Sequence, residues 1–241
     1  MRNYSKPGEY WNNQNISVNS QEIHLGLQKF MNDTYKQMSM GLGLAAIISF
    51  IISSNPAMIS GLINSGIIYI LMFALLGLGF VTPSIIMNKS MGMAQAAYWG
   101  TTALWGVILS PYLIIYSSAD IATAFLSAAI AFTGMSIVGY TTKKDLTTMG
   151  RFLGMATWGI LAAVILNLFL QNSGFEMILS ILVVMVFSGL TAYETQNLKN
   201  MYFQVSDPET RERMGILGAL SLFGNFVTLF IWILNLIGNR E

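Results

Sequence analysis

Long runs of apolar residues separated by short polar stretches dominate the chain beyond its N-terminal tail. An α-helix rises about 1.5 Å per residue, so about 20 apolar residues cross the roughly 30 Å hydrocarbon core of a bilayer. The runs lack the apolar–polar alternation that is typical of barrel strands. They predict transmembrane helices at residues 38–54, 62–83, 94–116, 121–140, 152–170, 175–193 and 208–237.

The chain divides into a tail and one membrane domain. Residues 1–31 are polar and lack the apolar core of a secretory signal. We expect them to form a flexible cytoplasmic tail that packs little, because they offer few apolar side chains to bury. Residues 32–241 form the predicted seven-helix domain, since the loops between the windows are too short for a second domain.

The seventh helix carries its own start signal and a polar stripe. Asp207, Pro208 and Glu209 are typical of an N-cap, a proline at the first helical position and an acid in the first turn. Small and polar residues then recur along one face at helical spacing. They are Gly218, Ser221, Asn225, Thr228 and Asn235. Because polar groups avoid lipid, this stripe predicts that the helix is largely enclosed by the bundle.

Positive charge is distributed asymmetrically between the loops. With the N-terminus in the cytoplasm, eleven of the twelve Lys and Arg residues lie on the cytoplasmic side, and Arg240 alone lies outside. The opposite loops, around residues 54–61, 117–120 and 171–174, contain no Lys or Arg. This is the positive-inside pattern, which predicts a cytoplasmic N-terminus and an external C-terminus.

Composition narrows the function classes further. Hydrophobic residues make up 54% of the chain and charged residues 10%, and the net charge of +1 gives no reason to expect nucleic-acid binding. There is no cysteine, and the single histidine, His24, lies in the polar tail. A zinc site, a histidine-dependent protease and a nucleotide-binding loop are therefore not expected. We expect no enzyme activity, no cofactor and no firm metal site.

Glu194, near the end of the sixth window, is the candidate functional carboxylate. One interpretation is an interfacial acid that ends a helix and reaches water, which its position alone favours. The other is a gating carboxylate that faces the bundle and makes transient contact with an ion such as Ca²⁺.

Several segments together resemble the Bax inhibitor family over residues 30–240. The stretch 139–146, which contains Lys143, Lys144 and Asp145, is similar to that family's loop between helices four and five. Residues 187–196 resemble its helix-six signature, with Glu194 where an aspartate is usual. Residues 219–226 resemble its seventh helix, and residues 35–43 resemble its first.

The resemblance implies a fold and a mechanism. The fold is an all-α bundle of seven transmembrane helices, with helix seven central and enclosed by the other six. The mechanism is a proton-sensitive Ca²⁺ leak, closed by two acids that share a proton on helices six and seven. These positions match Glu194 and Asn225, and Asn225 cannot ionise. An arginine often found late in the family's helix two is replaced here by Ile86.

Two functions follow from this altered acidic pair. The first is a passive leak for Ca²⁺ or other cations with modified pH gating. The alternative is a non-conducting regulatory partner of other membrane proteins in quality control or stress response. The expected partners are the lipid bilayer, cations and another membrane protein, and the expected location is the bacterial inner membrane.

Overall fold

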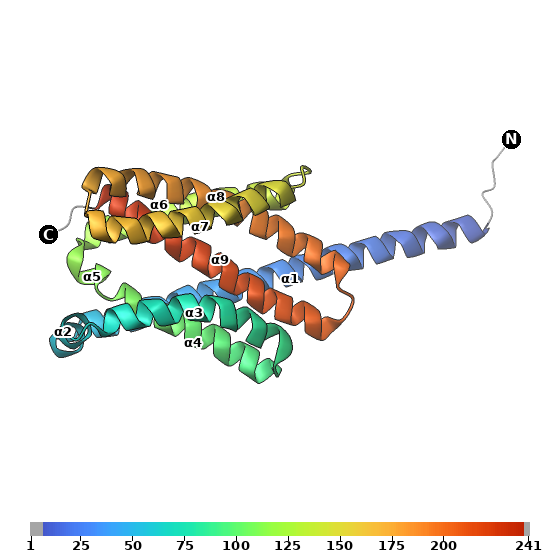
Figure 1. The fold of residues 1–241 in the computed structure, drawn as a ribbon. Helices are drawn as coiled ribbons and strands as arrows, with labels where there is room; N and C mark the ends of the chain where they lie inside the picture. The colour runs from blue at the N-terminus through green and yellow to red at the C-terminus, as the bar shows by residue number, and fades with distance from the viewer. Residues whose placement is uncertain (1–6, 239–241) are drawn as a thin grey trace.

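The computed structural model describes residues 7–238, with the backbone alone for residues 7–20 and for Leu168. This part of the chain is a bundle of α-helices without strands (Figure 1). The helices are α1 (Pro7–Ser53), α2 (Pro56–Asn64), α3 (Ile67–Asn88), α4 (Met91–Leu109), α5 (Tyr112–Ile115), α6 (Ser118–Thr141), α7 (Thr147–Leu170), α8 (Ser173–Gln204) and α9 (Pro208–Ile237). Within the described residues, seven segments are long and apolar enough to cross a membrane. The predicted all-α membrane bundle is confirmed.

Short polar signals set the helix boundaries. Asn55 caps α2, where its Oδ1 accepts hydrogen bonds from the backbone N–H groups of Ala57 and Met58. Gly66 then adopts the left-handed conformation with φ of 70° and separates α2 from α3. The predicted window 62–83 is therefore wrong at both ends, because α2 and Gly66 occupy its start and α3 continues through Pro83 to Asn88. Neighbouring helices make an internal proline tolerable in membrane helices.

Two predicted ends are wrong for a shared reason. Helix α1 begins at Pro7 instead of residue 38, and α8 ends at Gln204 instead of residue 193. Hydropathy windows stop where charges begin, whereas a helix can continue into the polar region with a buried apolar stripe. Leu27, Phe30 and Met31 form such a stripe and are buried in the core, so the expectation that residues 1–31 pack little is wrong for this stretch. Residues 1–6 lie outside the described residues.

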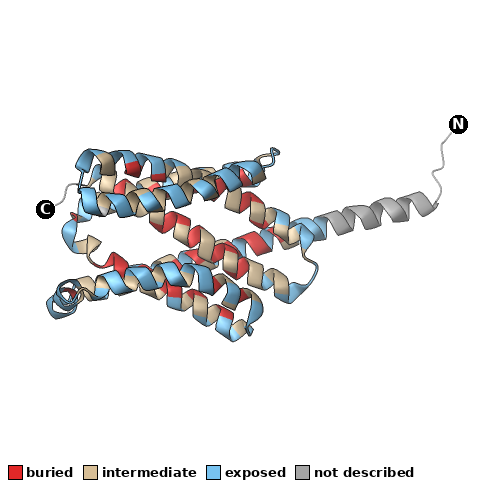
Figure 2. Ribbon diagram, viewed as in Figure 1, coloured by how far each residue is buried: buried red, intermediate tan, exposed pale blue. Residues whose placement is uncertain are grey.

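Helix α9 lies at the centre of the bundle. Figure 1 shows it running between the α3–α4 pair and the group formed by α6, α7 and α8. It packs against α1, α3, α4, α6 and α8, and its residues supply much of the buried core (Figure 2). Helix α7 packs against α8 instead, where the ring of Tyr193 lies over Gly150. The helices that enclose α9 are therefore chiefly five, and α7 forms an outer layer.

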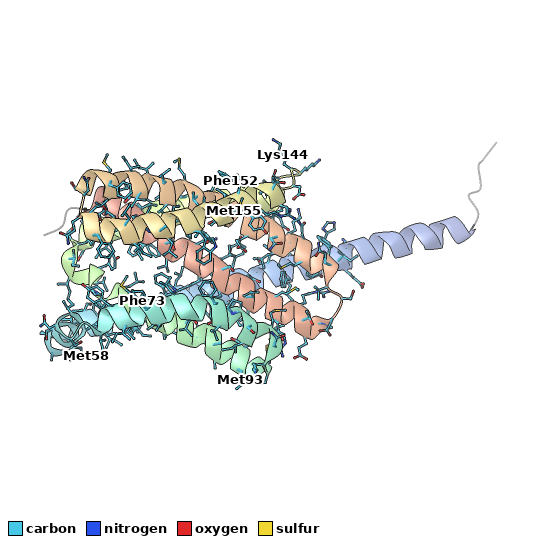
Figure 3. All side chains as sticks on the ribbon, viewed as in Figure 1. Met58, Phe73, Met93, Lys144, Phe152 and Met155 are labelled. Carbon is cyan, nitrogen blue, oxygen red and sulfur yellow. The ribbon has the colours of Figure 1, made fainter. Side chains whose placement is uncertain are left out.

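The two ends of the bundle differ in charge. One end, called here the basic end, contains the α3–α4, α6–α7 and α8–α9 loops (Figure 1). Lys89, Lys143, Lys144 and Arg211 lie there, and Figure 3 shows Lys144 at the tip of the α6–α7 loop. The loops of the opposite end carry no Lys or Arg among the residues described. Between the ends, large apolar side chains such as Phe73 and Met155 point outward (Figure 3).

Candidate functional site

The α8–α9 interface has a register that one close contact defines. The side chain of Leu198 on α8 lies so close to Gly218 on α9 that a Cβ at position 218 would overlap it. The two helices follow one another through a short loop and run antiparallel, so residues before Leu198 lie level with residues after Gly218. This contact therefore determines which residues of α8 and which residues of α9 lie at the same level of the bundle.

The register brings the two candidate gating residues into the same interface. Glu194 precedes Leu198 by four residues, so it shares the face of α8 that packs against α9. Asn225 follows Gly218 by seven residues, which is two turns along the same face of α9. Glu194 is level with Leu222, and Asn225 lies about 4.5 Å further along the axis. Along the bundle axis the two residues therefore differ in level by less than one helical turn.

Their surroundings are closely packed. Asn225 is buried, with 8% of its surface exposed, and Glu194 is half-buried. Thr191 and Thr195, on either side of Glu194, are fully buried. The hydroxyl of Thr191 donates back to the carbonyl of Phe187 at 2.8 Å, so it is satisfied within its own helix.

The Asn225 amide does not donate to Glu194. Its Nδ2 is buried and has no hydrogen-bond partner in the structure. The match of these two positions to the family's paired acids favours a hydrogen bond from this amide to the Glu194 carboxylate, and that hydrogen bond is absent. A buried N–H without a partner costs about 1–3 kcal/mol, so α9 carries an unmet donor at nearly the level of the Glu194 carboxylate.

The rest of the predicted stripe faces protein to differing degrees. Gly218 is buried, and Ser221, Thr228 and Asn235 are partly buried. Asn235 has a defined role, because its Oδ1 accepts a hydrogen bond from the hydroxyl of Tyr116 at 2.7 Å. Tyr116 follows α5 and is buried, so this contact fixes α9 at the end opposite the basic end.

An arginine from α9 holds the C-terminus of α3. Arg213 donates to the carbonyls of Ile86 at 2.7 Å and of Lys89, and it pairs with Glu209 at 2.6 Å. Ile86 itself is fully buried in the core. Sequence reasoning marked Ile86 as the site of a missing arginine but did not identify Arg213, which brings a guanidinium to the backbone of the same residue.

The motif loop between α6 and α7 is tied to α8. Gln196 accepts from the backbone N–H of Leu146 at 2.8 Å and donates to the carbonyl of Lys144 at 2.7 Å. Asp145 accepts from the N–H of Thr147 at 2.9 Å, and hydrogen bonds from Thr147 lower the pKa of this exposed carboxyl. Lys143 and Lys144 are left exposed beside this brace. Sequence reasoning missed Gln196, whose partners are about fifty residues away.

A second contact between distant residues reaches the same site. The hydroxyl groups of Tyr35 on α1 and Thr195 on α8 are 3.0 Å apart. Thr195 is the neighbour of Glu194, so α1 is linked by a hydrogen bond to the segment that carries the candidate carboxylate. Residues 160 positions apart form this pair, and no local sequence signal predicts it.

Comparisons with known proteins show the family of the chain. Residues 27–241 match the family described as inhibitor of apoptosis-promoting Bax1. The inner membrane protein YbhL of Escherichia coli is 37% identical over 219 residues, which cover 90% of this chain and 94% of YbhL. A protein of Borreliella burgdorferi is 34% identical over 228 residues, covering 94% of this chain and 98% of the relative. The chain therefore belongs to the Bax inhibitor family.

Proposed function

We propose that this protein is a passive Ca²⁺ leak channel whose path follows the α8–α9 interface. The observation that carries the proposal is the half-buried carboxylate of Glu194, which lies less than one helical turn along the axis from the buried Asn225, whose Nδ2 has no hydrogen-bond partner. Ca²⁺ prefers oxygen ligands, and a carboxylate within a membrane bundle is costly unless a function retains it. Family membership supports the same activity.

The proposed path has a closed form and an open form. In the closed form Leu198 packs against Gly218. This packing keeps water at the basic end from entering the α8–α9 interface. In the open form α8 and α9 separate slightly, and water enters beside Glu194 and Asn225. The Asn225 N–H then gains a water partner, which offsets part of the cost of separating the helices.

Asn225 changes how such a channel responds to pH. Two carboxylates that share a proton repel each other when the proton leaves, and this repulsion opens a gate. An amide cannot ionise, so the pair Glu194–Asn225 loses the repulsion. We therefore propose a leak with a shallow dependence on pH, in which Glu194 supplies the remaining response.

Calcium flux in proteoliposomes tests the proposal. Wild-type protein should let external Ca²⁺ enter liposomes that contain a Ca²⁺ dye, and the rate of entry should depend only weakly on pH. Glu194→Gln should slow this entry. Asn225→Asp should make the pH profile steeper. Glu212→Gln, which changes an exposed acid of α9, is the matched control and should leave both flux and profile unchanged. A steep wild-type profile that Glu194→Gln leaves untouched would contradict the proposal.

We also propose that the basic end faces the cytoplasm of a bacterium, across the inner membrane. The charge asymmetry between the two ends supports this orientation, and YbhL is an inner membrane protein. The chain has no cysteine, so a single introduced cysteine is the only residue of the protein that a maleimide labels. In intact cells an impermeant maleimide should label Ser60→Cys and spare Lys144→Cys. The reverse pattern would overturn the orientation.

A regulatory, non-conducting role is the second candidate, and the amide at position 225 favours it. The flux experiment separates the two functions. If neither wild type nor Asn225→Asp lets Ca²⁺ enter the liposomes at any pH, although both are folded, the non-conducting role replaces the channel.

A further inference from the structure

We propose that a groove between α1 and α6 binds an anionic phospholipid, with one acyl chain inside and the headgroup at the basic end. The groove has a volume of about 960 Å³. One wall is formed by α1 and the other by α6, and Phe226 of α9 lies at its floor.

The dimensions of the groove suit one lipid molecule. Its lining on α6 runs from Phe125 to Thr141, which is about 24 Å of helix. One leaflet contributes about 15 Å of hydrocarbon and about 5–7 Å of headgroup region, so a chain and its headgroup together need about 22 Å. The groove therefore has room along its length for a single lipid that lies parallel to the helices.

The deeper part of the groove is suited to an acyl chain. The rings of Phe125 and Phe132 pack edge-on against Phe226, with centroids 5.3 Å and 5.6 Å away. Small residues of α1 leave space on the opposite side of the groove, and a Cβ added at Gly43 would meet no atom within 4 Å. Aromatic rings with small residues beside them present an apolar channel into which a flexible chain fits.

One polar group in the groove has no partner in the protein. Ser136 lines the groove and is 9% exposed, and its hydroxyl makes no hydrogen bond. It lies five residues before Thr141 at the helix end, which is about 7.5 Å along the axis. The glycerol esters of a phospholipid lie at this depth, between headgroup and hydrocarbon. The Ser136 hydroxyl oxygen is itself buried, and a rotation about χ1 would turn it toward an ester carbonyl, to which a serine hydroxyl can donate.

Charge at the mouth of the groove favours an anionic headgroup. Lys143 and Lys144 follow directly after Thr141 and are exposed. Lys29, next to Gln28 at the same end of the α1 lining, is exposed as well. The acids nearby are Asp33 and Asp145, so lysines outnumber acids at this mouth. Lysines near a membrane surface attract anionic lipids, and this attraction selects phosphatidylglycerol over a zwitterionic lipid.

A photoreactive lipid tests the site. The full chain would be placed in vesicles of phosphatidylcholine with phosphatidylglycerol that carries a diazirine on one acyl chain. After irradiation, mass spectrometry would locate the adducts. They should concentrate on the groove walls, beyond the level found on the outer face of α7 in the same sample. Replacing Lys143 and Lys144 with glutamine should lower the groove adducts by about fivefold per lysine.

A matched pair of variants provides the control. Gly43→Phe fills the groove, and the groove adducts should be lost while those on α7 stay constant. Gly134→Phe adds the same ring to α6 outside the lining, where a Cβ also meets nothing within 4 Å, and should leave the groove adducts intact. Adducts spread evenly over α3, α6 and α7, or unchanged in Gly43→Phe, would overturn the proposal.

Discussion

Helices α9 and α7 have similar apolar composition and opposite surroundings. In α9, Leu222, Phe223 and Leu229 are fully buried. In α7, Phe152, Met155 and Phe169 are among the most exposed large apolar side chains of the described residues, at 65%, 66% and 81%. Figure 2 shows this contrast as a largely buried α9 beside an exposed α7. Both helices would be found by the same hydropathy window.

The difference lies in where the small and polar residues stand. Gly218 lets Leu198 approach the backbone of α9, and the stripe from Ser221 to Asn235 needs protein or water around it. In α7, Gly150 meets Tyr193, but Gly154 has open space where its Cβ would be. Apolar content therefore determines whether a helix enters the membrane, and the placement of small and polar residues determines whether other helices surround it.

The largest expected difference comes from removing a ring. Phe223 is fully buried with its ring edge-on to Trp105, so Phe223→Ala should leave a cavity. The expected loss of stability is about 3 kcal/mol. Phe169→Ala should cost almost nothing, because Phe169 already faces lipid. Reversible unfolding in mixed detergent micelles measures both, and equal losses would contradict the comparison.

Adding bulk should have the next largest effect. Gly218→Leu would force Leu198 away from α9, because the added Cβ has no space. Overpacking of this kind should cost about 2 kcal/mol. Gly154→Leu places the same side chain in open space on α7 and should leave stability unchanged or slightly higher. The unfolding midpoints of the two variants, compared with that of the wild type, test this difference. A Gly218→Leu protein as stable as the wild type would show that the α8–α9 interface is loosely packed.

A single hydrogen bond should matter less. Tyr35→Phe removes the hydroxyl that is 3.0 Å from the Thr195 hydroxyl and should cost about 1 kcal/mol. Tyr69→Phe on α3 is the control, since Tyr69 is exposed. The same unfolding assay applies. A loss at position 69 as large as that at position 35 would argue that Tyr35 acts through its ring alone.

Acid should affect α9 and α7 alike, because their first turns are both exposed. Thr210 donates its hydroxyl and its N–H to Asp207, and these hydrogen bonds lower the pKa of Asp207; Thr147 does the same for Asp145. A lowered pKa in the folded state means that the stabilisation is complete above the unfolded value of about 3.9. It is lost as the pH falls through the folded value.

Asp207→Asn and Asp145→Asn should therefore lessen the dependence of stability on pH below about 4. Near neutral pH the dependence of stability on pH should be the same as in the wild type. Unfolding curves measured across this acidic range provide the test. An effect confined to one of the two helices would mean that packing, and not the local turn, controls these carboxyls.

Sequence patterns predicted the seven spans and the bounds of α9, because a proline with an aspartate cap marks its start and charges mark the limits of most loops. They missed α2 and the extensions of α1 and α8, which continue as helices into the polar region. At the candidate site, Glu194 and Asn225 were recognised from motifs, and the register now places them in one interface. Tyr35, Gln196 and Arg213 were missed because their partners lie far away in the chain.

The proposed leak requires that water reach the polar face of α9 although protein surrounds this helix. Thiols react as thiolates, which form in water and not in hydrocarbon. A water-soluble maleimide should therefore label Asn225→Cys in proteoliposomes, more slowly at high Ca²⁺ if the cation occupies the same path. Trp158→Cys on the exposed, lipid-facing side of α7 should stay unlabelled. If Asn225→Cys is inert while the protein conducts Ca²⁺, or if both positions react equally, the α8–α9 interface is not the path.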